Sequence, residues 1–324
     1  MNAFLGIDIG SISINVVAAD AEGRTLMTHY ARVDGKPVDA LQAVLAHTAD
    51  ALPAGTQVAG LGTTGSARYL AAAVTGADIV KNEITAHARS AIHLHPEVRT
   101  IFEIGGQDSK VTIVRDGVVV DFAMNMVCAA GTGSFLDSQA KRLNMDVERL
   151  GQLAMLSDDP TPIAGRCTVF AESDMVHKQQ IGYRQEDILM GLCHAMVRNY
   201  LGNVCKGKTI TPPIVFQGGV SANPGIRRAF RDILQCDPII PQHHMVMGAY
   251  GAALIARRAN QTRFRGFDVA DHKIDARGFR CDDCANQCEI VEVQDDGAVL
   301  RRSGGRCGKW ETALDPAPTG HTSL

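Results

Sequence analysis

Two cysteines in the middle of the chain, Cys128 and Cys167, each stand just before a predicted helix. Cys128 precedes the glycine turn of "NMVCAAGTGSFLD", and Cys167 opens the segment "CTVFAESD". The N-terminus of a helix carries partial positive charge and free N–H donors, which stabilise thiolates and anionic metal centres. The pair therefore indicates metal or redox chemistry. The alternative is two buried thiols, because free cysteine is often a small core residue.

Four more cysteines lie close together near the C-terminus, in "RCDDCANQCEI" and "GGRCGKW". They are Cys281, Cys284, Cys288 and Cys307. A polar segment this short has too small a core to fold without a cross-link, so we expect metal ligation, for which both zinc and an iron–sulfur cluster fit. Free thiols are the third alternative. The remaining thiols have no such setting and are expected to be core residues: Cys193, Cys205 and Cys236.

Three glycine turns have the composition of phosphate-binding loops. A carboxylate beside such a turn can hold hydrated Mg²⁺, while glycine lets backbone N–H groups approach phosphate oxygens. The first turn offers Asp8, Gly10, Ser11 and Ser13. The second, "EIGGQDSK", offers Gly105, Gly106, Gln107, Asp108 and Lys110. The third, in "QGGVSANPG", offers Gly218, Gly219, Val220 and Asn223. Together they favour a nucleotide site over three unrelated structural turns.

A competing motif lies in "GLGTTG", residues 60–65, which matches the Gly-x-Gly-x-x-Gly pattern of dinucleotide-binding proteins. Asp78 follows near the distance expected for a ribose-binding acid. A dinucleotide site there would leave the other three turns unexplained. We therefore interpret this stretch as a strand-to-helix turn.

The elements that must position these turns follow a repeated order. Residues 4–23 and 101–124 both predict strands around a glycine turn with a nearby acidic residue, which indicates an internally duplicated α/β architecture. Helical spacing covers residues 38–51, 135–156 and 186–204. From about Asn260 the composition becomes polar and charged, which predicts a linker and a small appended module, with the last residues disordered.

Composition narrows the function classes. The chain has 324 residues, 45% of them hydrophobic and 21% charged, which is typical of a globular protein. A formal net charge of −3, with both signs interspersed, predicts no nucleic-acid partner and no membrane-surface partner. The N-terminus shows no secretory signal, so we expect a cytoplasmic protein whose cysteines are thiols, ligands or redox groups.

The order and spacing of the three turns resemble the actin, Hsp70 and sugar-kinase superfamily of ATPases. The resemblance implies two duplicated, ribonuclease H-like α/β domains around a nucleotide cleft that holds ATP and Mg²⁺. The expected boundaries are residues 1–95 plus 244–259 for domain I, 96–243 for domain II, and 260–324 for the linker and Cys-rich segment.

Several segments further resemble the ATP-dependent activators of 2-hydroxyacyl-CoA dehydratases and the related benzoyl-CoA reductase subunits. They are "MNMVCAAGTGSFLD", "CTVFAESD", "EIGGQDSK", "GGVSANPGIRRAF" and "GAYGAALIA". The resemblance covers about Phe4 to Ala259 and implies that Cys128 and Cys167 ligate one [4Fe–4S] cluster shared by a homodimer.

The same resemblance implies the remaining site roles. Asp8 organises Mg²⁺, and Gln107 or Asp108 orients the attacking water. The three glycine turns hold phosphates and adenosine, and a fourth turn in "AAGTGS" also faces ATP: Gly131, Thr132 and Gly133. Family members often have lysine where Asn15 stands, so the chain lacks one cation near the phosphates, and Lys110 is the candidate to replace it.

The implied function is ATP-driven transfer of single electrons from a ferredoxin or flavodoxin to a partner iron–sulfur dehydratase or reductase. A sugar or amino-sugar kinase of the same superfamily is the alternative, since "AAGTGS" also resembles a phosphate turn of such kinases. A third hypothesis is a nucleotide-sensing, metal-binding regulator built on the C-terminal thiols. The kinase would have no need of Cys128 paired with Cys167.

Overall fold

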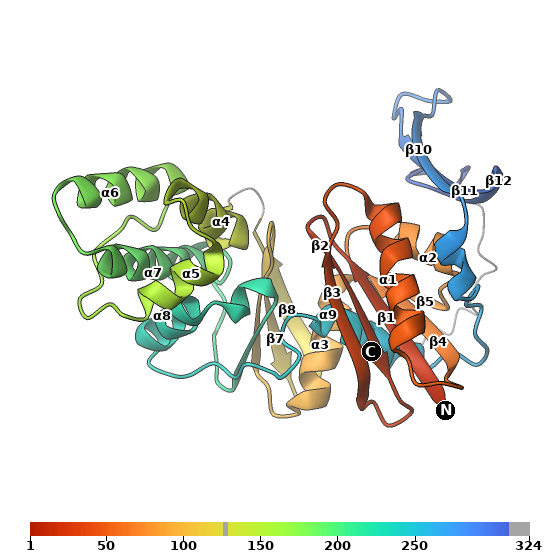
Figure 1. Ribbon diagram of the computed structural model, residues 1–324, viewed down its shortest axis with the longest axis horizontal. Coiled ribbons are helices and arrows are strands. Elements are labelled where there is room, and N and C mark those ends of the chain that lie inside the picture. Colours follow the sequence, from red (N-terminus) through yellow and green to blue (C-terminus); the bar gives the residue numbers. More distant parts are fainter. Residues whose placement is uncertain (126–128, 311–324) are drawn as a thin grey trace. The chain divides into compact units, whose positions relative to one another are not determined.

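The computed structural model describes residues 1–125 and 129–310, and the chain divides into two compact units (Figure 1). The first unit comprises Met1–Ser90 and the chain from Gly248 onward, and the second comprises Ala91–Met247. Helix α3 (Glu83–Leu94) contains one point of division, and the other falls within the first turn of α9 (Met247–Ala256).

The first unit is built on a five-stranded sheet in the order β3-β2-β1-β4-β5. Its strands are β1 (Asn2–Ile9), β2 (Ser13–Ala19), β3 (Thr25–Arg32), β4 (Gln57–Thr64) and β5 (Ile79–Val80). Strands β1 to β3 form an antiparallel meander, and β4 joins β1 in parallel. Helices α1 (Pro37–Ala51) and α2 (Arg68–Thr75) contribute to the apolar core.

Helix α9 approaches the same sheet very closely. An ideal Cβ added to Gly62 would lie 2.5 Å from the carbonyl oxygen of Ala252, and one added to Gly6 would overlap the carbonyl oxygen of Ala249. Glycines in β1 and β4 therefore make room for the helix backbone, and the small side chains of α9 serve the same close packing.

The second unit contains a four-stranded sheet in the order β8-β7-β6-β9. Its strands are β6 (Thr100–Ile104), β7 (Ser109–Arg115), β8 (Val118–Met124) and β9 (Ile214–Gln217). Its helices are α4 (Gly133–Arg142), α5 (Val147–Ala154), α6 (Thr168–Gln180), α7 (Gln185–Asn203) and α8 (Pro224–Leu234), with the short helices η1 (Ala129–Gly131) and η2 (Gly219–Ala222). The helical spacing over residues 135–156 corresponds to two helices, α4 and α5, because Asn144 adopts a left-handed backbone conformation (φ 53°) between them.

The two sheets have the same strand order. In each, an antiparallel meander of three strands is followed, after one or more helices, by a strand that joins the first strand in parallel. This agrees with the repeated pattern in the sequence. It also places the first and second glycine turns at equivalent points, between the first two strands of each sheet.

The C-terminal segment forms a small antiparallel sheet of its own, β10 (Ile274–Arg280), β11 (Glu289–Asp295) and β12 (Ala298–Ser303). It is attached to the first unit through η3 (Phe267–Asp271), where the side chain of Gln42 on α1 donates to the carbonyl oxygens of Val269 (3.1 Å) and His272 (2.7 Å). Val269 and Val293 join the core of the first unit.

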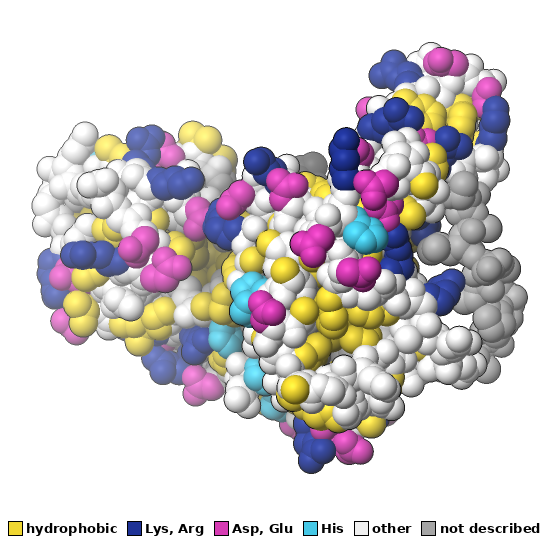
Figure 2. Space-filling view, turned by 45° about the vertical axis from the view of Figure 1, so that its right-hand side comes forward, with side chains coloured by type: hydrophobic (Ala, Val, Ile, Leu, Met, Phe, Trp, Pro, Cys, Tyr) yellow, Lys and Arg dark blue, Asp and Glu magenta, His cyan; other side chains and the backbone are white. Residues whose placement is uncertain are grey.

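The surface carries mixed charge. On the face drawn in Figure 2, Lys and Arg side chains are interspersed with Asp and Glu, in keeping with a formal net charge of −3. Among residues 1–125 and 129–310, the helices are all too short or too polar to cross a membrane.

Candidate functional site: two glycine loops and the cysteines

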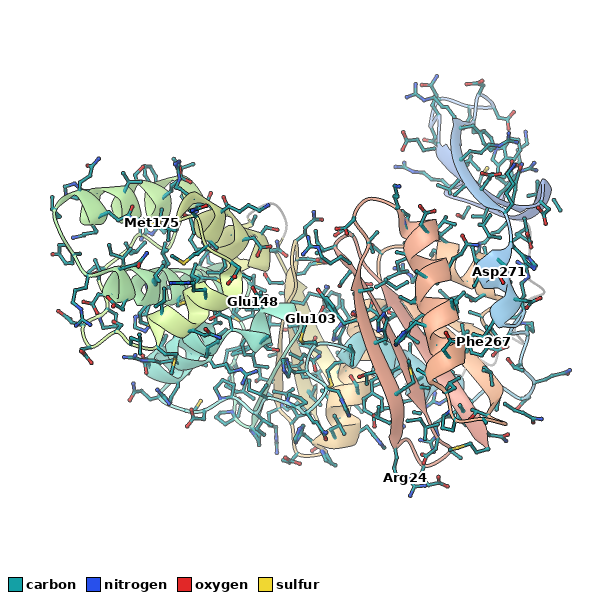
Figure 3. All side chains as sticks on the ribbon, viewed as in Figure 1. Arg24, Glu103, Glu148, Met175, Phe267 and Asp271 are labelled. Carbon is teal, nitrogen blue, oxygen red and sulfur yellow. The ribbon has the colours of Figure 1, made fainter. Side chains whose placement is uncertain are left out.

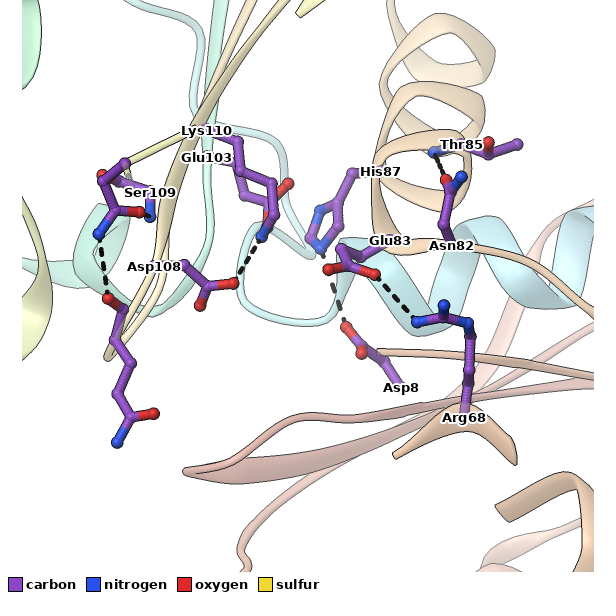
Figure 4. Close-up of polar contacts among 12 residues, drawn as sticks. Asp8, Arg68, Asn82, Glu83, Thr85, His87, Glu103, Asp108, Ser109 and Lys110 are labelled. Atoms are coloured by element: carbon purple, nitrogen blue, oxygen red, sulfur yellow. Dashed lines mark hydrogen bonds and ion pairs between the residues drawn. The ribbon is translucent and has the colours of Figure 1, made fainter. Parts of the chain in front are cut away.

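The carboxylate of Asp8 lies near the carboxyl end of β1, and the glycines around it have no space for a side chain. An ideal Cβ on Gly65 would lie 2.5 Å from Asp8 Oδ1. One on Gly248 would overlap Asp8 Oδ2 and would lie 2.9 Å from Nε2 of His87. The imidazole of His87 on α3 lies 3.8 Å from the Asp8 carboxylate (Figure 4). Glycines therefore surround this carboxylate where any side chain would displace it.

A row of oxygen atoms crosses the sheet at Asp8. Asp8 pairs with Asn15 on β2 and with Thr64 on β4, so the three side chains stand on one face of the sheet. Within the described residues, Asn15 Oδ1 and Thr64 Oγ1 are buried without a hydrogen-bond partner. A buried polar atom left unpaired costs about 1–3 kcal/mol, which makes such atoms indicators of a ligand. Carboxylate, amide and water oxygens are the ligands that Mg²⁺ prefers, so this row fits a hydrated Mg²⁺.

The turn after Asp8 is a tight hairpin. The N–H of Gly10 donates to the carbonyl oxygen of Ser13 over 2.9 Å, which joins β1 to β2. The second loop has the same bond: the N–H of Gly105 donates to the carbonyl oxygen of Asp108 over 2.9 Å, between β6 and β7. Equivalent positions in the two sheets thus carry glycine turns of matching geometry.

Lys110, on the strand after the second loop, is part of a buried ion-pair network. Its Nζ lies 3.0 Å from Oε1 of Glu103, which projects from β6, and 3.1 Å from Oδ2 of Asp108 (Figures 3 and 4). Burial alone would lower the pKa of Lys110, but the attraction of Glu103 and Asp108 prevails and raises it well above its usual value. The ammonium expected to serve as a phosphate cation is therefore already balanced by two carboxylates.

A neighbouring side chain that the sequence did not single out supports the same loop. Asn125, directly after β8, accepts a hydrogen bond from the N–H of Ser109 over 2.8 Å through Oδ1. Its Nδ2 donates to the carbonyl oxygen of Gln107 over 3.4 Å. Asn125 thus fixes the backbone on both sides of Asp108. The sequence does not indicate this role, because it depends on the pairing of β7 with β8.

Three glycine turns converge in the second unit. The N–H of Gly133 donates to the carbonyl oxygen of Gly105 over 2.9 Å, and that of Ser134 donates to Gly106 over 2.8 Å. An ideal Cβ on Gly133 would lie 3.1 Å from Cγ2 of Val220. The structure therefore brings together the second loop, the turn at residues 131–133 and the third loop at residues 218–220.

Asn223, which is expected to contact adenosine, stabilises the N-terminus of α8. It is the N-cap of α8, and its Oδ1 accepts from the N–H of Ile226 over 3.2 Å. An ideal Cβ on Gly151 would lie 2.6 Å from the same oxygen, so the side chain is closely packed as well. A nucleoside contact from Asn223 would have to share an amide that already caps a helix.

Cys167 is the N-cap residue of α6. Its backbone is extended (φ −145°, ψ 137°), its side chain makes no capping hydrogen bond, and its thiol is half-buried. Val169 and Phe170 follow in the first turn of the helix with 65% and 64% of their surface exposed. Cys128 lies outside the described residues. The expectation that Cys167 stands at a helix entrance is confirmed.

The thiols expected to be core residues differ in burial. Cys193 and Cys205 are buried, and burial raises the pKa of each thiol to about 12. Cys236 is half-buried at the edge of the second unit's core. Cys193 and Cys205 are therefore held as neutral thiols, as expected of structural cysteines.

The four C-terminal cysteines differ in exposure. Cys281 is buried, Cys288 is half-buried, and Cys284 and Cys307 are exposed. Among residues 1–125 and 129–310, the structure groups no three His, Cys, Asp or Glu side chains in a way that could hold a metal ion. The expected metal ligation by these thiols is therefore not seen in the arrangement described.

Asp78, the candidate ribose-binding acid, is engaged elsewhere. Its carboxylate accepts from the N–H of Leu61 (2.7 Å), the N–H of Arg263 (2.6 Å) and the hydroxyl of Thr262 (3.1 Å). It therefore anchors the segment after α9 to the first unit. The stretch at residues 60–65 is the end of β4 and the turn before α2, as interpreted from the sequence.

Comparison with solved structures defines the class. An activator of the 2-hydroxyisocaproyl-CoA dehydratase from Clostridium difficile, with bound ADPNP, matches with a TM-score of 0.70 and 32% identity, over 83% of this chain and 96% of that one. Component A of the (R)-2-hydroxyglutaryl-CoA dehydratase of Acidaminococcus fermentans matches with a TM-score of 0.72 and 31% identity, over 80% and 98%. The fold is thus that of the actin-like and sugar-kinase-like activator ATPases.

The chain belongs to the BadF/BadG/BcrA/BcrD ATPase family, which it matches over residues 5–256. A relative named activator of lactoyl-CoA dehydratase, from Anaerotignum propionicum, is 33% identical over 273 residues, 80% of this chain and 99% of that protein. A relative named 2-hydroxyisocaproyl-CoA dehydratase activator, from Clostridioides difficile, is 36% identical over 66% of this chain and 89% of that protein. The family match ends before β10, so it does not include the C-terminal sheet.

Proposed function

We propose that the protein is an ATP-dependent activator that drives single electrons into a partner iron–sulfur enzyme, such as a 2-hydroxyacyl-CoA dehydratase, a benzoyl-CoA reductase or a double-cubane protein. The observation that carries the proposal is membership of an ATPase family over residues 5–256, together with relatives named as dehydratase activators across most of their own length. The sugar-kinase alternative has weaker support, because a glucokinase structure from Streptomyces griseus is only 16% identical and indicates the fold alone.

In this proposal the glycine loops bind ATP and Mg²⁺. Asp8 holds the hydrated metal, and its water ligands donate to the oxygens of Asn15 and Thr64, which have no other partner in the part of the chain that the structure describes. The second loop binds phosphate, with Gln107 or Asp108 positioning the attacking water. The remaining phosphate and nucleoside contacts come from residues 10–13, 131–133 and 218–223.

The electron-carrying part rests on the cysteines. We propose that Cys128 and Cys167 of two chains hold one [4Fe–4S] cluster, since such a cluster takes four thiolates and a twofold axis supplies them. The half-buried thiol of Cys167 at a helix N-terminus fits an anionic centre. The exposed side chains of Val169 and Phe170 beside it fit a face that a second copy covers.

When bound, the cluster supplies a one-electron redox centre whose potential depends on burial and hydrogen bonding. A reduced ferredoxin or flavodoxin is the proposed donor. Lowering a potential by about 100 mV costs about 2.3 kcal/mol per electron, and allosteric coupling energies are typically about 1–3 kcal/mol. A nucleotide-dependent conformational change with a coupling energy of that size would therefore be enough to make the cluster a strong reductant.

Anaerobic purification tests the proposal. We expect a brown dimer that bleaches in air, and we expect Cys128→Ser and Cys167→Ser to lose the iron of the shared cluster while still binding ATP. Cys236→Ser is the matched control, since that thiol has no assigned role, and it should keep its iron. Asp8→Asn should keep the iron and lose ATP hydrolysis. A protein that stays colourless after anaerobic iron–sulfur reconstitution, and that phosphorylates a sugar, would refute the activator and support the kinase.

A further inference from the structure

The turn between β4 and α2 packs against the first glycine loop. The N–H of Ala67 donates to the carbonyl oxygen of Ile9, the last residue of β1, over 3.0 Å. Gly65 has φ +89°, and an ideal Cβ on it would overlap the same oxygen. Thr64, just before this turn, is fully buried, and its Oγ1 has no hydrogen-bond partner in the part of the chain that the structure describes, which indicates a ligand here. Arg68 is the first residue of α2, so its side chain starts one residue after the backbone contact with the loop.

The guanidinium of Arg68 lies at the same turn. Its Nη1 donates to the carbonyl oxygen of Gly65 over 2.9 Å and lies 3.6 Å from Oε2 of Glu83 on α3 (Figure 4). A guanidinium has five N–H donors in a planar fork. Within the described ranges, 1–125 and 129–310, the side chain of Arg68 makes the one hydrogen bond to Gly65. Most of its donors are therefore available to a ligand, and the side chain is 25% exposed.

An aromatic ring supports this guanidinium. The Cζ of Arg68 lies over the ring of Tyr69, 4.9 Å from its centroid, and the Cζ of Arg301 on β12 lies over the same ring, also at 4.9 Å. Stacking limits the orientations of a guanidinium, so less conformational entropy is lost when it binds a ligand. Arg68 is thus better prepared to bind an anion than a fully solvated surface arginine.

Lys110, the cation first considered for phosphate, lacks these properties. Its side chain is 5% exposed, and its Nζ lies 3.0 Å from Glu103 and 3.1 Å from Asp108. Arg68 forms one ion pair among the described residues, with Glu83 at 3.6 Å, which is longer than a hydrogen bond. A phosphate carries more negative charge than one carboxylate and accepts two parallel N–H bonds from an arginine. Phosphate can therefore compete with Glu83 for this guanidinium.

We propose that Arg68 binds a phosphate group of the nucleotide and exchanges its contact with Glu83 for a bidentate contact with phosphate oxygens. This role depends on the proposed function in one respect, that ATP or ADP binds at the first loop. No proton moves and no covalent bond changes, since arginine keeps its charge throughout. Glu83 is then the counterion of Arg68 in the absence of nucleotide. Its side chain is 24% exposed, so water can solvate the carboxylate once Arg68 leaves it.

Calorimetry of the full chain and its variants with ADP and with adenosine, both in the presence of Mg²⁺, tests the proposal. We expect Arg68→Gln to weaken ADP binding by roughly 10- to 100-fold, the size of a charge-assisted hydrogen bond, and to leave adenosine binding unchanged. Arg301→Gln is the matched control, because it removes the other guanidinium from the Tyr69 ring, and it should change neither. ADP binding that Arg68→Gln leaves unchanged, or that Arg301→Gln weakens as much, would overturn the proposal.

Glu83→Gln provides a second measurement, in which Arg68 is kept. The change releases Arg68 from its carboxylate, so we expect ADP to bind about two- to fivefold more tightly, the size of a partly exposed ion pair. The gain should vanish when Glu83→Gln is combined with Arg68→Gln. No gain, or an equal gain in both backgrounds, would overturn the exchange.

These binding measurements need no iron–sulfur cluster, so they separate the role of Arg68 from the rest of the proposed function. An unmodified chain that binds neither ADP nor adenosine would refute the proposed nucleotide site, and the role of Arg68 with it. ADP binding that is indifferent to Arg68→Gln would refute the role of Arg68 alone.

Discussion

Lys110 gives the sharpest test of how the second loop is held. Replacing Lys110 with methionine removes the ammonium but keeps an apolar side chain of similar length. The side chain of Glu103 is only 10% exposed, so its carboxylate then stays buried without the Lys110 cation. Removing one partner of a buried ion pair costs about 3–5 kcal/mol, and a domain of this size loses roughly 2–4 °C in Tm for each kcal/mol. We therefore expect Lys110→Met to unfold about 6–20 °C below the unmodified protein.

Urea unfolding and calorimetry measure this effect, and a double-mutant cycle isolates the pair. Glu103→Gln combined with Lys110→Met should cost less than the sum of the single changes, because neither variant residue then leaves a buried charge alone. Lys208→Met is the matched control, since Lys208 pairs with Asp121 over 2.7 Å where the aspartate side chain is 50% exposed. Exposed pairs contribute about 0–1 kcal/mol. A Lys110→Met loss no larger than that of Lys208→Met, or strictly additive single changes, would refute the reasoning.

The same pair fixes a pH dependence. The pKa of Lys110 in the folded protein is raised above its usual value of 10.5. The stabilisation is therefore complete below that value, and it is lost as the pH rises through the folded-state pKa. Stability measured from neutral to strongly alkaline pH should fall more steeply for the unmodified protein than for the double variant.

Four further changes test the first unit. Gly248→Ala should displace the carboxylate of Asp8 and lower Mg²⁺-dependent ATP hydrolysis at least tenfold. The control is Gly202→Ala, which should leave hydrolysis unchanged because a Cβ there meets nothing within 4 Å. Equal effects of the two changes would contradict the argument that Asp8 has no room beside Gly248. Thr64→Val removes a buried hydroxyl that has no partner among the described residues, so the metal-free protein should gain about 1 kcal/mol in free energy of unfolding while calorimetry shows weaker Mg²⁺ binding. Asn15→Lys adds a cation beside the first loop, so ADP binding should depend less on Mg²⁺. The dissociation constant of ADP without Mg²⁺, divided by the one with Mg²⁺, should therefore fall. An unchanged ratio would place Asn15 away from the phosphates. Asp78→Ala should lower the free energy of unfolding by about 2–4 kcal/mol and open the chain after residue 260 to limited proteolysis, with ATP hydrolysis unchanged.

The parts of the fold that depend on near neighbours in the chain could be predicted from the sequence. The hairpin at Asp8 and the turn at Gly105 are local, and alternating apolar residues identify the strands around them. The helix at residues 38–51 was predicted within one residue of α1 (Pro37–Ala51). The three-stranded C-terminal sheet was not predicted, because Asp, Glu and Arg residues interrupt the alternation of apolar residues in its strands.

The rest of the site depends on contacts between residues far apart in the sequence. Gly248 borders Asp8 because α9 packs against β1, and the sequence gives no register for that packing. From the sequence Lys110 is a candidate phosphate cation, because its partner Glu103 can be identified only once β6 and β7 are aligned, with these two residues directly opposite. Thr64 belongs to the Gly-x-Gly-x-x-Gly pattern at residues 60–65, which suggests a dinucleotide site. Its position beside Asp8 follows only from the pairing of β1 with β4.

The charges around the two loops indicate how the proposed site would bind a polyanion. The first loop carries the carboxylate of Asp8 and the neutral amide of Asn15, and the second carries one ammonium, that of Lys110, between the carboxylates of Glu103 and Asp108. Within each unit these side chains are more negative than positive, so each loop by itself would repel phosphate unless another positive charge is added. A divalent cation supplies that charge, and glycine turns let neutral backbone N–H groups approach the phosphate oxygens without a side chain in the way. Under the proposed function, Mg²⁺ would therefore be needed for the nucleotide to bind as well as for its hydrolysis, which would tie the activity to the oxygen row at Asp8.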